Sequence, residues 1–279
     1  SEMCIRDRDR LPEFPVCLQR ISLFYWFIWS SSGQGEMEET VKNKTDIFIR
    51  KLKQIDVTLD QKQMERFELY YEMLIEKNKV MNLTAITEPE EVIDKHFVDS
   101  LAINKIVDLK NVKSVIDIGT GAGFPGIPLK IAFPWLEITL LDSLNKRIKF
   151  LDEVVDALRL EQIKCIHGRS EDIARQEEHR EKYDLCVSRA VANLSTLSEL
   201  CIPFVKKGGE FISYKAANSQ EEIEQAGNAI GKLGGRLAGV QELILPDTDM
   251  ERIFVCIKKE KNTGKKYPRK AGTPGKEPL

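Results

Sequence analysis

The chain has 279 residues, of which 42% are hydrophobic and 31% are charged, and its formal net charge at pH 7 is −2. This length suits one large α/β domain with an extension or two small domains, and the composition is that of a soluble globular protein. So small a net charge gives no basis for inferring a polyanionic partner from charge alone.

The first 36 residues differ from the rest. Residues 1–10 mix arginine and aspartate without apolar periodicity, and the hydrophobic run Ile21–Trp29 is too short to span a bilayer. No A-x-A-like cleavage site follows that run. We therefore expect residues 1–36 to be an appended extension, disordered or due to a misassigned start, with Met37 as the natural beginning and no membrane association.

Residues 37–108 predict a helical N-terminal region. Apolar side chains recur at the helical period up to about Lys79, and Asp60 is a suitable N-cap for the second helix.

A second helical signal follows, because Thr87 and Glu90 have the spacing of a capping box. The helix that they predict carries Lys95, His96 and Asp99 on neighbouring turns. These side chains either point toward a substrate or form a local ion pair on a half-exposed helix face.

The stretch Ser114–Gly126 reads S-V-I-D-I-G-T-G-A-G-F-P-G and predicts a buried strand that ends in a glycine turn. Because Gly119, Gly121 and Gly123 have no Cβ, their backbone N–H groups can approach a ligand closely.

The spacing of this turn fits two ligand classes. Gly121, Gly123 and Gly126 satisfy the dinucleotide pattern G-x-G-x-x-G, and Asp142 lies 21 residues after Gly121, near the position of a ribose-binding acid.

Other residues favour a different ligand. Pro125 and Pro128 occupy the helix start, where a dinucleotide needs free N–H groups. In the alternative register, Asp117 lies at the strand end and faces the crevice, where it suits a ligand with positive charge, such as S-adenosylmethionine. The sequence therefore favours a methyl donor over a dinucleotide.

After the turn, strands and helices alternate as in an open α/β sheet with a topological switch point. Further strands are predicted at 137–141, 163–167, 184–188, 210–214, 237–245 and 252–258, with the last two antiparallel, which makes seven. Helices are predicted at 145–158, 193–204 and 219–233, and Gly208–Gly209 is predicted to turn into the fifth strand. We take residues 109–259 as the domain that holds this sheet.

A ligand in such a sheet binds beyond the carboxyl ends of the strands. The candidate site residues at these ends are Asp117 and Gly119 after the first strand, Asp142 after the second, Ser170 and Glu171 after the third, and Arg189 after the fourth. Acids after the first two strands fit an amino-acid moiety and a ribose diol, and the pair after the third suits an adenine edge.

The last segment is strongly basic. From Lys258 to Lys276 there are eight lysine or arginine residues and one acid, Glu260. A basic tail over residues 260–279 is a candidate nucleic-acid contact, although a solvated disordered tail is the commoner cause of such a run. Lys215, at the end of the fifth strand, either orients RNA or lies at a solvated strand end.

The cysteines give a weaker signal. The six cysteines include no C-x-x-C pair and no metal-ligand spacing, so we expect no metal. Cys165, Cys186 and Cys256 fall in predicted buried strands, where reduced cysteine acts as a small apolar residue, which favours a reducing cytoplasm.

Several motifs together resemble the small-subunit (16S) ribosomal RNA guanine-N7 methyltransferase family, also called glucose-inhibited division protein B. They are M-N-L-T-A-I at 81–86, K-H-F-V-D-S-L at 95–101, D-I-G-T-G-A-G-F-P-G-I-P-L-K at 117–130, L-D-S-L-N-K-R at 141–147, S-R-A-V-A at 188–192 and Y-P-R-K-A-G-T-P at 267–274. The resemblance covers about Met37–Leu279, and residues 1–36 have no counterpart in it.

The resemblance implies a seven-stranded, Rossmann-like S-adenosylmethionine-dependent methyltransferase fold with an N-terminal helical extension, acting on one guanine of the small-subunit RNA. The family's cofactor positions fall on Gly119, Phe124, Ser170, Glu171 and Arg189. Two departures are mild, because Ser170 stands where the family often has alanine and Lys95 where it usually has arginine.

This resemblance leads to the expected mechanism. Guanine N7 already holds a lone pair, so transfer needs no base to remove a proton, and the enzyme gains rate by alignment. Catalytic residues stay unassigned, with Arg189 and His96 as candidates, and His96 is expected to shape the guanine pocket. Phosphate contacts are expected from Lys258, Lys259, Lys265, Lys266, Arg269 and Lys270.

The expected partner is small-subunit ribosomal RNA or the assembling small ribosomal subunit, and we expect a monomer. Two rivals stay open. A small-molecule methyltransferase has no use for a basic tail, and a dinucleotide oxidoreductase binds NAD instead of the methyl donor.

Overall fold

The computed structural model describes residues 45–189, 192–217 and 219–279. Residues Phe48–Leu279 form one compact unit, and of the other unit, Ser1–Ile47, only residues 45–47 are described, in helical conformation. The predictions for residues 1–36 and for a helix beginning at Met37 lie outside the described residues.

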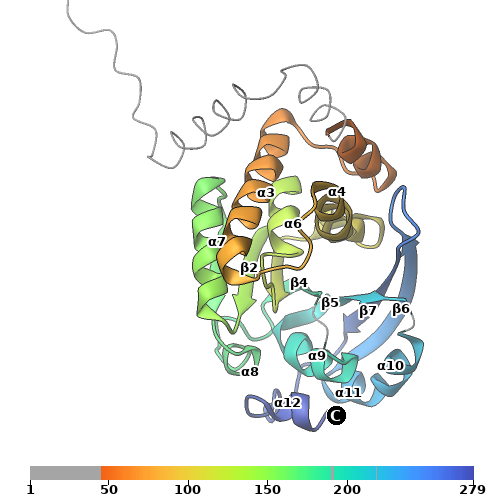
Figure 1. Cartoon of the computed structure of the whole chain (residues 1–279). Coiled ribbons are helices and arrows are strands. Elements are labelled where there is room, and N and C mark those ends of the chain that lie inside the picture. Colours follow the sequence, from red (N-terminus) through yellow and green to blue (C-terminus); the bar gives the residue numbers. More distant parts are fainter. Residues whose placement is uncertain (1–44, 190–191, 218) are drawn as a thin grey trace, which may run out of the picture. The chain divides into compact units, whose positions relative to one another are not determined.

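A mixed sheet of seven strands runs through the described part of the larger unit (Figure 1). The strands are β1 (Ser114–Ile118), β2 (Glu137–Asp142), β3 (Ile163–His167), β4 (Tyr183–Ser188), β5 (Val205–Ala216), β6 (Gly235–Ile244) and β7 (Glu251–Lys259). They lie in the order β3-β2-β1-β4-β5-β7-β6, and β7 is antiparallel to both of its neighbours. The predicted α/β fold with seven strands is confirmed.

β5 is longer than the sequence predicted. Gly208 and Gly209 do not turn into the strand but continue it, because Val205 already pairs with Tyr183 across a local shift in register.

Helices flank the sheet. Residues 48–54 are helical, and the further helices are α3 (Gln61–Met81), α4 (Pro89–Val92), η1 (Ile93–Val98), α5 (Asp99–Leu101), η2 (Ala102–Lys105), η3 (Leu109–Asn111), α6 (Gly126–Ala132), α7 (Asn145–Ala157), α8 (Ser170–Ile173), α9 (Leu194–Cys201), η4 (Ile202–Phe204), α10 (Gln220–Gln225), α11 (Gly227–Lys232) and α12 (Thr273–Lys276). None of the helices in the described ranges is long and apolar enough to cross a membrane.

Helix starts match the sequence in one place and differ in another. The Asp60 carboxylate accepts the Gln63 N–H and the Gln63 side chain bonds back to Asp60, which confirms the predicted N-cap of α3. The predicted capping box at Thr87 is wrong, because α4 begins at Pro89, whose fixed φ starts a helix without a side-chain cap. The single helix predicted over 219–233 is divided into α10 and α11.

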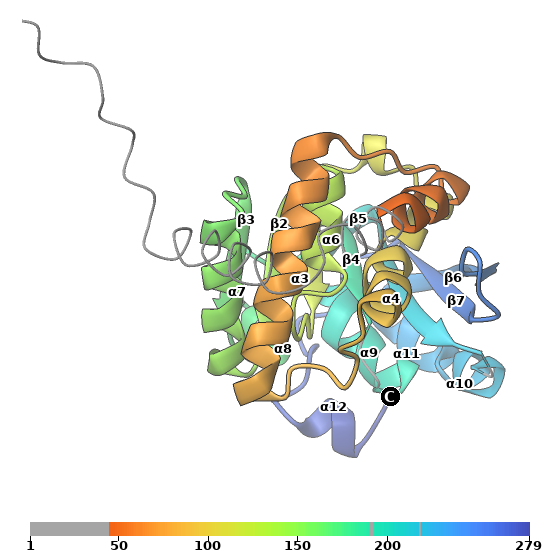
Figure 2. The ribbon, with the colours of Figure 1, turned by 45° about the horizontal axis from the view of Figure 1, so that its top comes forward.

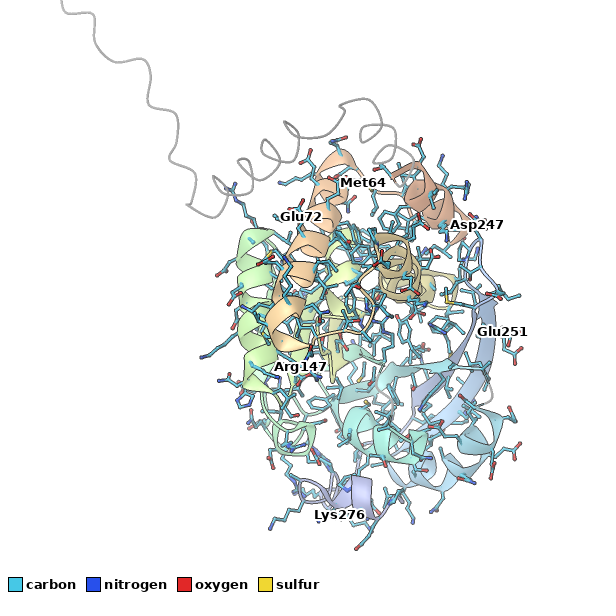
Figure 3. All side chains as sticks on the ribbon, in the orientation of Figure 1. Met64, Glu72, Arg147, Asp247, Glu251 and Lys276 are labelled. Atoms are coloured by element: carbon cyan, nitrogen blue, oxygen red, sulfur yellow. The ribbon has the colours of Figure 1, made fainter. Side chains whose placement is uncertain are left out.

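Two apolar layers sandwich the sheet because successive side chains of a strand point to opposite faces. Val115 and Leu140 belong to the cluster that contains α3, α6 and α7, whereas Ile116 and Leu141 belong to the cluster that contains α9, α10 and α11. Figure 1 shows α3, α6 and α7 apart from α9 and α11, and Figure 2, turned so that the top comes forward, shows α3 in front. Side chains fill the space between the helices and the sheet in Figure 3.

The helical layer also fixes the glycine turn. The Tyr70 hydroxyl, on α3, donates to the Ala122 carbonyl oxygen at 2.7 Å. Gly123 adopts φ +108°, and a Cβ there would lie 2.7 Å from Ile127 and 2.8 Å from the Tyr70 hydroxyl. The turn is therefore packed too closely for any residue but glycine at this position.

We expect Gly123→Ala to lower the free energy of unfolding by about 3 kcal/mol, because left-handed strain and overpacking each cost about 1–2 kcal/mol. Urea unfolding measures this change. Gly231→Ala in α11 is the matched control, since no atom lies within 4 Å of the added Cβ, and it is expected to stabilise the fold by up to about 1 kcal/mol. Similar effects for both variants would show that the turn is not tightly packed.

Candidate functional site

Asp117, at the end of β1, holds the glycine turn together from behind. Its Oδ2 accepts the Thr120 hydroxyl at 2.7 Å and the Gly126 N–H at 2.9 Å, and the residue is fully buried. Burial raises the pKa of this carboxyl to about 6, against the opposing effect of its hydrogen bonds. The sequence predicted that this carboxylate faces the crevice. That prediction is wrong, because Asp117 is fully buried and its Oδ2 binds groups of the turn itself.

The start of α6 has few free N–H groups. The Gly126 N–H is bound by Asp117, the Ile127 N–H donates to the Gly123 carbonyl oxygen at 2.7 Å, and Pro128 has none. A pyrophosphate at a helix N-terminus needs such groups to be available. The structure therefore favours the methyl-donor interpretation over the dinucleotide interpretation.

Asp142, at the end of β2, lies beside the turn. Its carboxylate accepts hydrogen bonds from the Gly121 N–H at 3.0 Å, the Leu144 N–H at 2.8 Å and Nη1 of Arg147 at 3.2 Å. The ends of β1 and β2 are thus brought together as expected. Contact between Asp142 and a ribose stays a prediction.

Ser170 and Glu171 begin α8 and fasten it to later parts of the chain. The Ser170 hydroxyl donates to the Leu200 carbonyl oxygen at 2.5 Å, and the buried Glu171 carboxylate accepts the Gly272 N–H at 2.8 Å. These side chains therefore have structural partners, and their contact with adenine stays a prediction.

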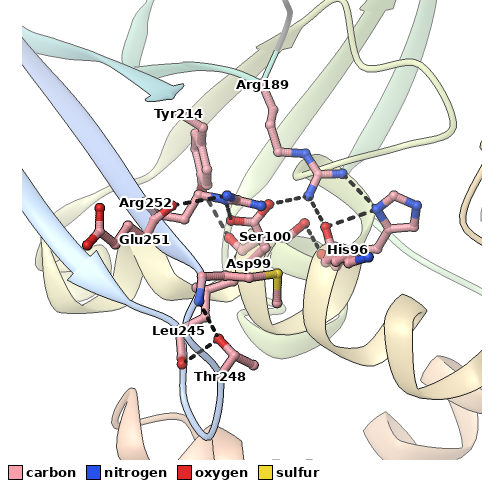
Figure 4. Close-up of polar contacts among 11 residues, drawn as sticks. His96, Asp99, Ser100, Arg189, Tyr214, Leu245, Thr248, Glu251 and Arg252 are labelled. Atoms are coloured by element: carbon pink, nitrogen blue, oxygen red, sulfur yellow. Dashed lines mark hydrogen bonds and ion pairs between the residues drawn. The ribbon is translucent and has the colours of Figure 1, made fainter. Parts of the chain in front are cut away.

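Asp99 binds two arginines that come from different strands (Figure 4). Its Oδ2 lies 2.8 Å from Nη1 of Arg189, just after β4, and its Oδ1 lies 2.7 Å from Nε of Arg252 in β7. Asp99 is only 1% exposed, so both of its oxygens are satisfied within the protein. It directly follows η1, a short π-helix within the helical stretch that the sequence predicted, and such local widening recurs at functional sites.

His96, in η1, connects the cluster of Asp99, Arg189 and Arg252 with the glycine turn. Its ring stacks on Phe124 with centroids 4.4 Å apart, and the Arg189 guanidinium lies 5.1 Å from the Phe124 centroid. The His96 Nε2 lies 2.9 Å from the Thr84 hydroxyl. Burial, together with the Arg189 charge, lowers the pKa of His96 to about 4, so the imidazole is neutral near pH 7.

A cavity of about 460 Å³ adjoins this cluster. It is lined by Ile86, Lys95, His96, Asp99, Arg189, Tyr214, Lys215, Ala216, Ser219, Glu222 and Arg252. The cavity therefore lies beyond the carboxyl ends of β4 and β5, on the edge of the sheet where a ligand was expected.

Lys215 belongs to this cavity. It is 8% exposed, and its ammonium group donates to the Ala192 carbonyl oxygen at 2.8 Å and to Oε1 of Glu222 at 2.6 Å. Lys215 is therefore not a solvated strand end, which was one of its two open interpretations.

The C-terminal segment packs against α9, in the helical layer that contains α9, α10 and α11. Arg269 forms a two-pronged ion pair with the fully buried Glu199, and Tyr267 and Pro274 are buried. The alternative interpretation of the basic run, a solvated, disordered tail, is therefore wrong for these residues.

The predicted phosphate contacts differ in their environments, and Lys258 pairs with Glu210 at 2.9 Å. Lys259 is 1% exposed and donates to the Ile202 carbonyl oxygen at 2.9 Å, so the prediction that it contacts phosphate is wrong. Lys265, Lys266 and Lys270 are exposed, but none of them lines the cavity.

Sequence reasoning did not identify Arg252 and Glu222. Neither lies in a motif, and each reaches the cavity only because β5, β7 and α10 are neighbours in space. The described residues contain no group of three or more His, Cys, Asp or Glu side chains arranged to hold a metal ion.

A family model and curated relatives match most of this chain. The family model for rRNA small subunit methyltransferase G (GidB) matches residues 63–249. A ribosomal RNA small subunit methyltransferase G from Lachnoclostridium phytofermentans is 55% identical and covers 83% of this chain and 96% of its own. The protein of that name from Bacillus licheniformis is 50% identical and covers 83% and 97%. Among solved structures, M. jannaschii TYW2 in complex with AdoMet matches with a TM-score of 0.44 and 15% identity over 53% of this chain and 69% of that chain.

The lowered pKa of His96 predicts a pH dependence of folding. The unfolded state binds a proton near pH 6.5 and the folded state only near pH 4, so His96 imposes no penalty above pH 6.5 and a growing penalty as pH falls toward 4. At pH 4 this penalty is expected to reach about 3 kcal/mol.

Unfolding of the wild type and of His96→Gln between pH 4 and 8 measures the effect, and the variant is expected to lose less stability on acidification. An NMR titration of the three histidines gives the pKa directly. A His96 pKa at or above 6.5 would contradict the buried, neutral state.

Proposed function

The chain belongs to the rRNA small subunit methyltransferase G family, and from this premise we propose that it transfers a methyl group from S-adenosylmethionine to N7 of one guanine in small-subunit ribosomal RNA. The observation that carries the proposal is the junction of the glycine turn with the cavity through Phe124, His96 and Arg189. A methyl donor at the turn and a base in the cavity would meet at this junction.

The residues at the turn fit a cationic cofactor. Oδ1 of Asp117 is buried without a hydrogen-bond partner among the described residues, so negative charge lies directly behind the turn. A Cβ at Gly121 would meet only the Gly119 carbonyl oxygen, at 3.9 Å, so a ligand can approach the backbone there. A diphosphate would be repelled by this carboxylate, whereas a sulfonium and an amino group are attracted.

When bound, S-adenosylmethionine supplies an electrophilic methyl group on its sulfonium. The protein's task is to align guanine N7 with that group and to exclude water, because the N7 lone pair needs no prior deprotonation. His96 is neutral and packed between Phe124, Arg189 and Thr84, so it shapes the site and removes no proton.

Cofactor-binding roles are proposed for Gly119, Gly121, Phe124, Asp142, Ser170, Glu171 and Arg189, and RNA-binding roles for Lys215, Lys265, Lys266 and Lys270. The main role proposed for Arg269 is structural, because its guanidinium pairs with Glu199, and RNA contact is proposed only as a minor role. Since the substrate is ribosomal RNA, the protein is proposed to act in the cytoplasm, on free RNA or on an assembling small subunit.

The proposed reaction is tested with purified protein, S-adenosylmethionine and unmethylated small-subunit RNA. Mass spectrometry is expected to map one N7-methylguanine. RNA with 7-deazaguanine at that position is expected to accept no methyl group, because a C–H group replaces N7. Transfer to the deaza RNA, transfer to another base or a complete lack of transfer would refute the assignment.

The exposed lysines of the tail make a separate prediction. Replacing Lys265, Lys266 and Lys270 together by alanine is expected to reduce the slope of log affinity for RNA against log salt concentration by about 2, since each phosphate contact contributes roughly 0.7–0.9. Affinity for S-adenosylmethionine, measured by calorimetry without RNA, is expected to stay unchanged.

The matched control replaces three exposed lysines on the other side of the sheet by alanine. They are Lys53 in the helical residues 48–54, Lys62 in α3 and Lys149 in α7. The salt dependence of this control is expected to equal that of the wild type. An unchanged slope in the tail variant would exclude these three contacts, and would favour the small-molecule rival if RNA methylation also failed.

A further inference from the structure

We propose that Lys215 and Glu222 select the base in the cavity, with Glu222 accepting hydrogen bonds from guanine N1–H and the 2-amino group while Lys215 donates to O6. This inference rests on the proposed function, and it adds the residues that distinguish guanine from the other bases.

The two side chains present a donor and an acceptor next to each other. Lys215 uses two of its three N–H donors, on Ala192 and on Oε1 of Glu222, and keeps one. Oε1 of Glu222 also accepts the Leu194 N–H, so the carboxylate is fixed in place. Its Oε2 has no hydrogen-bond partner among the described residues, and the side chain is 24% exposed.

The other carboxylate of the cavity is not available for this role. Both oxygens of Asp99 are bound by arginines, and the residue is 1% exposed. Glu222 therefore offers the available carboxylate oxygen among the described residues that line the cavity.

The order of donor and acceptor matches guanine. Guanine presents an acceptor at O6 followed by donors at N1 and the 2-amino group, whereas adenine presents a donor at the exocyclic N6 and an acceptor at N1. An ammonium beside a carboxylate complements the guanine pattern. Against adenine it would place the ammonium donor opposite the N6 donor and the carboxylate acceptor opposite the N1 acceptor. Binding guanine by this edge also leaves N7 free for the methyl group.

The charge of Glu222 also suits the reaction. Methylation at N7 puts positive charge on the purine ring and makes N1–H and the 2-amino group stronger donors. Hydrogen bonds to a carboxylate therefore strengthen as the methyl group is transferred, and such bonds raise kcat rather than only binding.

Inosine in place of the target guanine tests the pairing, because it keeps O6, N1–H and N7 and lacks only the 2-amino group. For the wild type, kcat/KM on the inosine RNA is expected to be roughly 10- to 100-fold lower than on the guanine RNA. For Glu222→Gln, kcat/KM on guanine RNA is expected to fall by a similar factor, and the guanine-to-inosine ratio to shrink to within about 3-fold.

Glu224→Gln, on the exposed side of α10, is the matched control and is expected to keep the wild-type ratio. Because each ratio is measured within one protein preparation, partial misfolding of a variant cancels. A wild type without preference for guanine, or a Glu222→Gln variant that keeps the wild-type ratio, would overturn the assignment. If the wild type does not methylate guanine RNA at all, the proposed function itself fails.

Discussion

The cavity depends on one buried interaction, the pairing of Asp99 with Arg189 and Arg252. Moving a carboxylate out of water costs several kcal/mol, which close charge pairs and full hydrogen bonding must offset. Here each oxygen has its own guanidinium partner, and the partners come from the end of β4 and the start of β7. The ion pairs therefore fix α5, which directly follows η1, against two strands that are far apart in sequence, and the cavity lies where these elements meet. A neighbouring bond, from the Tyr214 hydroxyl to the Ser100 carbonyl oxygen at 3.0 Å, joins β5 to the same segment.

Arg189 links these ion pairs to the glycine turn through its contact with Phe124. Its guanidinium is bound by Asp99 and the Lys95 carbonyl oxygen, lies over the Phe124 ring and approaches His96, and its side chain is only 17% exposed. A side chain held on several sides loses little further entropy when a ligand binds, so its charge is preorganised. Phe124 also ends the glycine turn, so the turn contacts two of the residues that line the cavity, His96 and Arg189. In the proposed reaction this contact would place a methyl donor at the turn next to a base in the cavity, and such alignment is the main requirement of methyl transfer to a lone pair.

The sequence predicts those features that local patterns determine. The β-branched run of β1, the glycines at 119, 121 and 123 and the Asp60 cap each depend on a few adjacent residues, and each is found in the structure. The direction of a side chain depends instead on its partners. Asp117 turns inward because Thr120 and the Gly126 N–H bind it, and Lys259 is buried because a strand end lies against η4. Arg252 and Glu222 have no local signal at all, since their partners in the cavity, Asp99 in α5 and Lys215 in β5, are distant in sequence or lie in another element. The family resemblance implied which residues bind the cofactor, but it did not imply which side chains these and other residues contact in the fold.

The balance of charge around the cavity explains why so many of its ions are paired. Four cationic side chains line it, Lys95, Arg189, Lys215 and Arg252, and the carboxylates of Glu91, Asp99 and Glu222 pair with them. A cavity of unpaired cations would attract RNA phosphates, but it would repel a sulfonium and would oppose the positive charge that develops on the methylated purine. Pairing removes most of this repulsion and keeps the hydrogen-bond donors in place. The site can therefore present donors to a nucleotide without a strong positive potential at the atom that receives the methyl group. The exposed lysines that would attract the phosphate backbone lie outside the cavity, in the C-terminal segment, where their charge does not oppose the transfer.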